Sequence, residues 1–228
     1  MLTLTKEDAL ALHAGLAKTH ASNHLCRPDT RLVVEGYPRS SNSFAVDMIA
    51  ESAVGHLRRP DIAHHTHDVA NLKIAQAYGI PKVILIREPE DAILSFHIYS
   101  NAPIAQCAKK YADFYAEALE LMENSAVIHF RDVTGDFRTV IERLNAIGDF
   151  GIPEDQDFEA IRIRALDLVR SRASTTNQED ATRQVAAPDP DREEIKTRLR
   201  GEVQTFLAAH PRAQNVYNRV MTRIGLPA

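Results

Sequence analysis

The sequence of 228 residues contains no tryptophan, only two cysteines and no long apolar run. Cys26 and Cys107 are too few for a disulfide framework or a thiolate metal site, so we expect two free thiols. Apolar runs such as Val83–Ile86 fall far short of a bilayer span of about 20 residues. Charged residues interrupt the apolar residues near the N-terminus, which argues against a signal peptide. We therefore expect a cytoplasmic protein without a membrane span.

An excess of basic charge is also lacking. Lysine and arginine number 27 against 31 aspartates and glutamates, which gives a formal net charge of −4. This balance gives no electrostatic case for a nucleic acid or an acidic membrane as partner, so any basic site must be local. The chain is long enough to bury a full core, and we expect one domain over residues 1–228. The oligomeric state stays open.

Hydrophobic periodicity predicts repeated strand, loop and helix units. A capping box at Thr5 and Asp8 opens a first short helix. A strand over 31–37 precedes a helix with apolar positions from 44 to 57, and a strand over 83–86 precedes a helix over 91–99. We also expect a strand at 126–130, a polar loop at 171–190, and helices over 104–123, 134–147, 155–170 and 191–208.

This alternation indicates an α/β fold. Strands that alternate with helices form a three-layer structure with a mainly parallel central sheet and helices on both faces. Ligands of such sheets bind beyond the carboxyl ends of the strands. The two motifs described next both lie at predicted strand ends.

The first motif is the loop Gly36–Ser43, between a strand and a helix. Such a loop leaves backbone amides free for an anion, and the helix dipole adds to the attraction. In the Walker pattern of nucleoside triphosphatases a lysine would stand at the position of Asn42. The lysine is missing, and Arg39 supplies a cation earlier in the loop. The alternative from the residues alone is a polar turn in which serine or asparagine caps the helix.

The segment Tyr37–Phe44 resembles the first signature of the PAPS-dependent sulfotransferases, Tyr-Pro-Lys-Ser-Gly-Thr-Thr-Trp. Arginine replaces lysine, as bacterial members often show. Ser41 replaces a glycine, which crowds the loop if that position needs a positive φ. The resemblance implies the P-loop type of sulfotransferase fold, with the 5′-phosphosulfate of the donor bound by Arg39, Ser40, Ser41, Asn42, Ser43 and Phe44. It also implies that Arg39 stabilises the departing phosphate.

A second segment, Arg87–Ser95, resembles the second signature of the family, Arg-x-Pro-x-Asp with a serine eight residues after the arginine. In this resemblance Arg87 and Ser95 hold the 3′-phosphate, which distinguishes PAPS from ATP. The planar guanidinium suits that task because it forms paired hydrogen bonds with phosphate oxygens. The alternative is an arginine paired with Glu88 or Asp91 at the strand end.

Between the two signatures stand three histidines, His64, His65 and His67. Many sulfotransferases carry a Lys-Thr-His segment here, and Thr66 and His67 match its last two positions. The resemblance implies that His67 is the catalytic base, because the acceptor hydroxyl must lose a proton and imidazole titrates near neutral pH. His65 takes the lysine position. A metal site and a surface loop without a role are the alternatives, and no metal is expected.

The resemblance covers residues 30–150 well, as the donor-binding core, and the helical part 151–228 loosely. Phe130 takes the place of a family tyrosine, where it either packs near the adenine or is a buried strand residue. The C-terminal family signature Arg-Lys-Gly is absent. A polar stretch could replace it as a lid, around Arg170, Arg172, Thr175 and Thr176.

Together the motifs imply transfer of a sulfuryl group from PAPS to a hydroxyl or amine of a small-molecule or carbohydrate acceptor, with adenosine 3′,5′-bisphosphate as product. Two alternatives remain. One is a P-loop nucleotide kinase or hydrolase, and the other is a non-catalytic nucleotide-binding protein. The loops that would contact the acceptor carry no pattern that identifies it.

Overall fold

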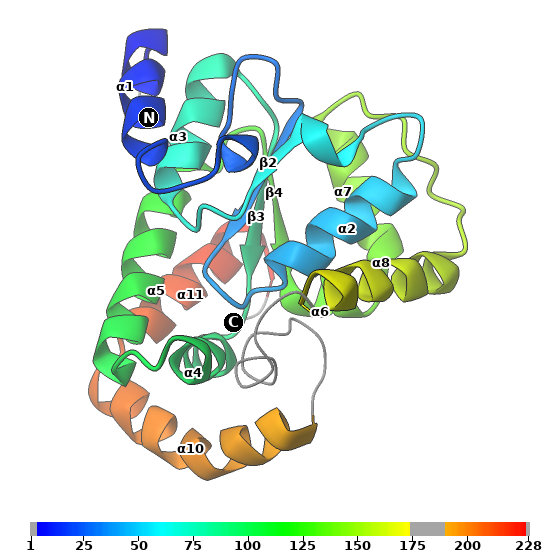
Figure 1. The fold of residues 1–228 in the computed structure, drawn as a ribbon. Coiled ribbons are helices and arrows are strands. Elements are labelled where there is room, and N and C mark those ends of the chain that lie inside the picture. Colours follow the sequence, from blue (N-terminus) through cyan, green and yellow to red (C-terminus); the bar gives the residue numbers. More distant parts are fainter. Residues whose placement is uncertain (1–3, 174–189, 227–228) are drawn as a thin grey trace.

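A computed structural model describes residues 4–173 and 190–226 (Figure 1). At its centre four parallel strands form one sheet in the order β2-β1-β3-β4. The sheet confirms the predicted α/β class with a parallel core. The strands are β1 (Leu32–Gly36), β2 (Ile62–His64), β3 (Lys82–Ile86) and β4 (Ser125–His129).

The strand order creates a switch point between β1 and β3. From β1 the chain crosses to β2 on one side, and from there it returns past β1 to β3 on the other. The two central strands are in register at their carboxyl ends, where Gly36 pairs with Leu85. The connections that follow these two strands run in opposite directions and leave a crevice between them. Ligands of parallel sheets usually bind in such a crevice.

Helices cover both faces of the sheet, as predicted (Figure 1). Residues of each strand alternate between the two cores: Val33 and Ile84 face one, and Val34 and Val83 face the other. The first core is covered by α1 (Lys6–Leu16), α3 (Val69–Tyr78), α4 (Pro89–Ser100), α5 (Ile104–Ala118) and α11 (Arg212–Arg223). The second is covered by α2 (Asn42–Ser52), α6 (Phe130–Thr134), α7 (Phe137–Ile147) and α8 (Phe158–Ala173).

One further helix, α10 (Pro190–Ala209), packs against α4 and α5 (Figure 1). Within the described ranges, no helix is both long and apolar enough to cross a membrane.

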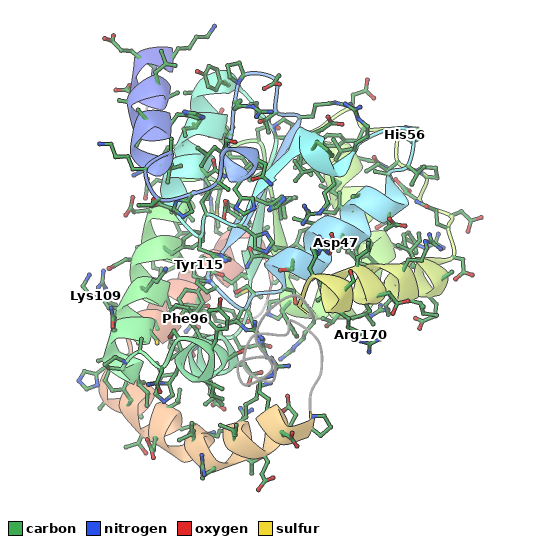
Figure 2. All side chains as sticks on the ribbon, in the orientation of Figure 1. Asp47, His56, Phe96, Lys109, Tyr115 and Arg170 are labelled. Atoms are coloured by element: carbon green, nitrogen blue, oxygen red, sulfur yellow. The ribbon has the colours of Figure 1, made fainter. Side chains whose placement is uncertain are left out.

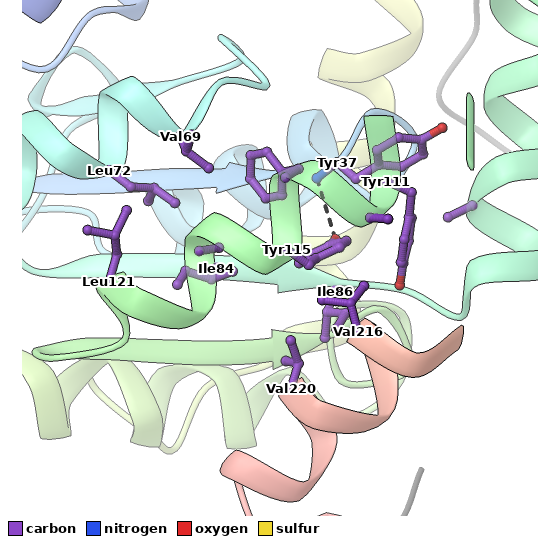
Figure 3. Close-up of a cluster of buried hydrophobic side chains, with 14 of the residues drawn as sticks. Tyr37, Val69, Leu72, Ile84, Ile86, Tyr111, Tyr115, Leu121, Val216 and Val220 are labelled. Atoms are coloured by element: carbon purple, nitrogen blue, oxygen red, sulfur yellow. Dashed lines mark hydrogen bonds between the residues drawn. The ribbon is translucent and has the colours of Figure 1, made fainter. Parts of the chain in front are cut away.

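Three buried tyrosines tie the first core to the switch point (Figure 3). Tyr115 on α5 donates its hydroxyl to the carbonyl of Leu85 over 2.7 Å, and Tyr111 donates to the carbonyl of Arg87 over 2.6 Å. Tyr37, just after β1, donates to the carbonyl of Cys107 on α5 over 3.0 Å. Each such bond adds about 1 kcal/mol, and together they lock the loops after β1 and β3 onto one helix.

Several element boundaries differ from the sequence prediction. The predicted helix over 134–147 is divided, because α6 ends at Thr134 and α7 begins after the N-cap Asp136. The predicted strand at 126–130 ends at His129, so Phe130 is the first residue of α6 and not a strand residue. Residues 171–173 of the predicted loop belong to α8, and 174–189 lie outside the described residues. Strand β2 and helices α3 and α11 were not predicted.

Candidate functional site

A cavity of about 700 Å³ lies at the carboxyl ends of β1 and β3. Its wall contains most of the residues singled out from the sequence, although these come from segments up to 56 positions apart. They are Arg39, Ser41, Asn42, Ser43, Phe44, His67, Arg87 and Ser95. Ser40 lies beneath the wall: its side chain is fully buried, and its hydroxyl is 3.5 Å from that of Tyr115.

The loop after β1 holds two residues in the left-handed region, Arg39 at φ 70° and Ser41 at φ 69°. The position of Ser41 therefore does have the positive φ that a glycine would favour, at a cost of about 1 kcal/mol for a side chain. Ser41 is the N-cap of α2 but forms no side-chain cap bond. The interpretation as a turn capped by the Ser41 side chain thus fails, and the N-terminus of α2 lies at the cavity, which its first residues Asn42, Ser43 and Phe44 line.

Asn42, at the Walker lysine position, is turned into the protein. Its Nδ2 donates to the carbonyl of Tyr37 over 3.1 Å. The neighbouring Gly36 has no room for a side chain, since a Cβ would lie 2.6 Å from the carbonyl oxygen of Leu85. The loop therefore sits directly on the β1 and β3 ends, and its cation is Arg39 rather than a lysine in the helix.

Arg87 and Arg39 lie next to each other across the switch point. Arg87 donates to the carbonyl of Arg39 over 3.2 Å, and Nε of Arg39 donates to the hydroxyl of Ser95 over 3.3 Å. The guanidinium of Arg87 lies over the ring of Phe130, 4.1 Å from the centroid, and pairs with Asp91 at 3.7 Å. Its Nε is buried and has no hydrogen-bond partner among the described residues. The two predicted anion-binding arginines thus form one contiguous surface.

Burial lowers the pKa of Arg39 to about 10, and repulsion from Arg192 and Arg87 contributes. Arg39 therefore remains a cation at neutral pH. Desolvation likewise lowers the pKa of Arg87, but attraction to Asp91 and Glu88 opposes the shift. Two buried cations so close together favour a ligand with several negative charges.

The sequence interpretation missed other cations of the cavity. Along the part of its wall that the structure describes, seven lysines and arginines face two carboxylates, although the whole chain is acidic. Arg200 of α10 pairs with Asp91 at 3.0 Å and also with Glu90. In the sequence these further cations stand only in charged helical segments, and such segments usually face solvent. The cations beyond Arg39 and Arg87 are Lys110, Arg162, Arg192, Lys196 and Arg200.

His67, which lines the same cavity, has a defined tautomer. Its Nδ1 lies 2.8 Å from the carbonyl oxygen of Gly36, which can only accept, so Nδ1 carries the hydrogen and Nε2 keeps its lone pair. Burial lowers the pKa of His67 to about 4, and repulsion from Lys110 and Arg39 adds to the effect. At neutral pH the ring is therefore uncharged and Nε2 can accept a hydrogen bond or a proton. Its pKa is lower than the near-neutral value expected from the sequence, because burial disfavours the charged imidazolium.

His65 also lines the cavity, and the buried His64 packs against it outside the lining. Nε2 of His65 lies 2.7 Å from the hydroxyl of Ser43, and its Nδ1 lies 2.7 Å from Nδ1 of His64. Burial lowers the pKa of both rings, that of His64 to about 3. His65 therefore supplies no cation where the family has a lysine. The described residues contain no group of three or more side chains that could hold a metal ion.

The residues considered for a lid lie elsewhere or are not described. Arg172 pairs with the buried carboxylate of Asp47, where α8 lies beside α2 (Figure 2). Arg170 is exposed and pairs with Asp167 at 3.5 Å. Neither arginine belongs to the cavity wall. Thr175 and Thr176 lie outside the described residues.

Comparison with known proteins gives one informative similarity. No protein-family model matches the chain, and no curated protein matches its sequence. Among solved structures, the fold is similar to the mouse sulfotransferase SULT7A1 complexed with PAP, with a TM-score of 0.50. The match covers 96% of each chain at 13% sequence identity. It shows that the chain has the sulfotransferase fold.

Proposed function

We propose that the protein is a sulfotransferase that moves a sulfuryl group from PAPS to a hydroxyl or amine acceptor and releases adenosine 3′,5′-bisphosphate. The observation that carries the proposal is the meeting of the loop after β1, the pair Arg87 and Ser95, and His67 in one cavity. The fold similarity over the whole chain supports it.

The donor would be held at its two charged ends. The loop around Arg39 and the first amides of α2 would bind the 5′-phosphosulfate. Arg87, with its buried unpartnered Nε, and Ser95 would bind the 3′-phosphate. A second phosphate site with an arginine already oriented by Phe130 distinguishes this donor from a nucleoside triphosphate.

The chemistry is an in-line transfer. The acceptor oxygen forms a bond to sulfur while the bond from sulfur to the bridging phosphate oxygen breaks, and Nε2 of His67 takes the acceptor proton. Negative charge then grows on the departing 5′-phosphate, where Arg39 stabilises it. Positioning and electrostatics supply most of the catalysis, as in phosphoryl transfer. Because the sulfuryl group carries less charge than a phosphoryl group, this proposal includes no divalent cation.

Calorimetric titration tests the proposal against its rivals. We expect adenosine 3′,5′-bisphosphate to bind without Mg²⁺ and at least about 10-fold more tightly than ATP, since only the former carries a 3′-phosphate. Preference for ATP with Mg²⁺ would indicate a kinase or hydrolase instead. Transfer of radiosulfate from PAPS to a panel of phenols, sugars and amines tests the activity. Tight binding without any transfer would indicate a non-catalytic nucleotide-binding protein.

A further inference from the structure

Glu35 is a fully buried carboxylate in an otherwise apolar strand. It stands on β1 immediately before Gly36, and the position takes no part in either sulfotransferase signature. Among the residues that the structure describes, no lysine or arginine forms an ion pair with it. Burying a carboxylate without a cation costs several kcal/mol unless hydrogen bonds replace its water. The partners of Glu35 therefore indicate its role.

Four donors surround the Glu35 carboxylate. Three come from Thr66 and His67, and the fourth comes from Asn71 on α3. Oε1 accepts from the amide of Thr66 over 3.0 Å, from the hydroxyl of Thr66 over 2.7 Å and from Nδ2 of Asn71 over 2.9 Å. Oε2 accepts from the amide of His67 over 2.9 Å. One side chain thus binds the backbone amides of two consecutive residues, Thr66 and His67.

The segment that Glu35 binds is strained. His65 and His67 adopt φ angles of 65° and 51°, so two residues with side chains are in the left-handed region on either side of Thr66. Each costs about 1 kcal/mol, and such conformations persist only where surrounding contacts hold them. Four hydrogen bonds to a buried carboxylate are sufficient to offset this cost.

His67 is consequently held at two points by consecutive residues of β1. Its backbone amide donates to Glu35, and its ring Nδ1 donates to the carbonyl of Gly36. We infer that Glu35 is a positioning residue, which holds the turn 64–67 so that Nε2 of His67 faces the cavity. The catalytic part of this inference rests on the proposed sulfotransferase function.

The test compares Glu35→Gln with Asp47→Asn. Glutamine keeps one acceptor oxygen for Thr66 and Asn71 but places an NH₂ group against the amide of His67. Asp47 is an equally buried carboxylate on the neighbouring helix α2, but its partners are Arg59 and Arg172. It is therefore a control for the loss of a buried carboxyl group.

The first measurement is the imidazole tautomer of His67 in long-range ¹H–¹⁵N spectra, with the signal assigned by its loss in His67→Gln. We expect a single tautomer with hydrogen on Nδ1 in the unchanged protein and in Asp47→Asn, and a mixture in Glu35→Gln. The same single tautomer in Glu35→Gln would overturn the inference. If that variant does not fold, Thr66→Val, which removes one donor to Glu35, is expected to show a smaller shift in the same direction, and no shift would overturn the inference.

The second measurement is turnover with an acceptor found in the panel. We expect Glu35→Gln to lower kcat about 10- to 100-fold, as for a misplaced catalytic group, while affinity for adenosine 3′,5′-bisphosphate changes less than about 2-fold. An equal loss in Asp47→Asn would assign the effect to stability and refute the positioning role. The tautomer measurement needs no donor or acceptor, so failure of the proposed function is distinguishable from failure of this inference.

Discussion

The two walls of the cavity differ in how they treat charge. The arginine wall, formed around Arg39, Arg87 and Arg200, is ionic, and carboxylates such as Asp91 neutralise only part of its positive charge. The histidine wall, which consists of His65 and His67 with the buried His64 packed against His65, is neutral because burial lowers the pKa of all three rings. Cations on one wall help to keep the other uncharged, since Arg39 and Lys110 repel a proton from His67. In the proposed reaction, anion binding and proton transfer would therefore fall to different groups of residues that are coupled electrostatically.

The sharpest test of this separation is His67→Ala. We expect turnover to fall about 10²- to 10⁴-fold, because the variant lacks the group that accepts the acceptor proton. Affinity for adenosine 3′,5′-bisphosphate should remain within about 2-fold, since the arginine wall is intact. Single-turnover kinetics measures the rate of transfer, and calorimetry measures the affinity for adenosine 3′,5′-bisphosphate. Unchanged turnover would remove His67 as the base.

A converse effect is expected for Arg87→Ala. Loss of a charged hydrogen-bond donor to the 3′-phosphate should weaken the binding of adenosine 3′,5′-bisphosphate 10- to 100-fold, or about 1.4–2.7 kcal/mol. Binding of 5′-AMP, which lacks that phosphate, should change little. Arg170→Ala, at an exposed site outside the cavity, is the matched control. Equal weakening of both nucleotides would contradict the assignment of Arg87 to the 3′-phosphate.

Acid should act first on the stability of the histidine wall. In the folded chain the pKa of His67 is about 4 and that of His64 about 3, whereas unfolded histidine titrates near 6.5. Between these values the unfolded chain binds more protons, so the free energy of unfolding falls as the pH falls. Glu35, whose pKa burial raises to about 7, opposes this trend, but one carboxylate is outweighed by several histidines.

Urea unfolding at about pH 7 and about pH 4.5 measures the effect, and we expect a loss of about 1–2 kcal/mol. His67→Gln should reduce the loss, because it deletes one buried imidazole, whereas Arg87→Ala should not. A loss that is the same in all three proteins would show that the histidine wall is not its source.

The fold class, and the positions of the two proposed anion-binding segments at strand ends, were predictable because they depend on local patterns. Apolar runs bounded by Gly36 and Pro89 mark strand ends and helix starts, and parallel strands bring such ends to one edge of a sheet. Short elements were harder to predict from the sequence. Strand β2 has three residues, Ile62–His64, and gains its stability from pairing with β1 rather than from any periodicity of its own.

Glu35 illustrates a residue that sequence analysis passed over. A single acid in the run Leu32–Gly36 is a usable signal, since a carboxylate in a fully buried strand needs a reason. Its partners, however, stand 31 to 36 positions away in the chain. Likewise, nothing local in the charged segment of α10 predicted that Arg200 would reach Asp91.

The sequence by itself determined the alternation of strands and helices, the cation of the first loop, and the pairing of that loop with Arg87. These follow from residue types at fixed spacings along the chain. Only the tertiary structure decided which residues share a cavity, that Nδ1 of His67 carries the ring hydrogen, and that Glu35 binds the backbone amide of His67. Those properties depend on burial and on contacts between distant segments, which set the pKa and the tautomer and which no spacing along the chain encodes.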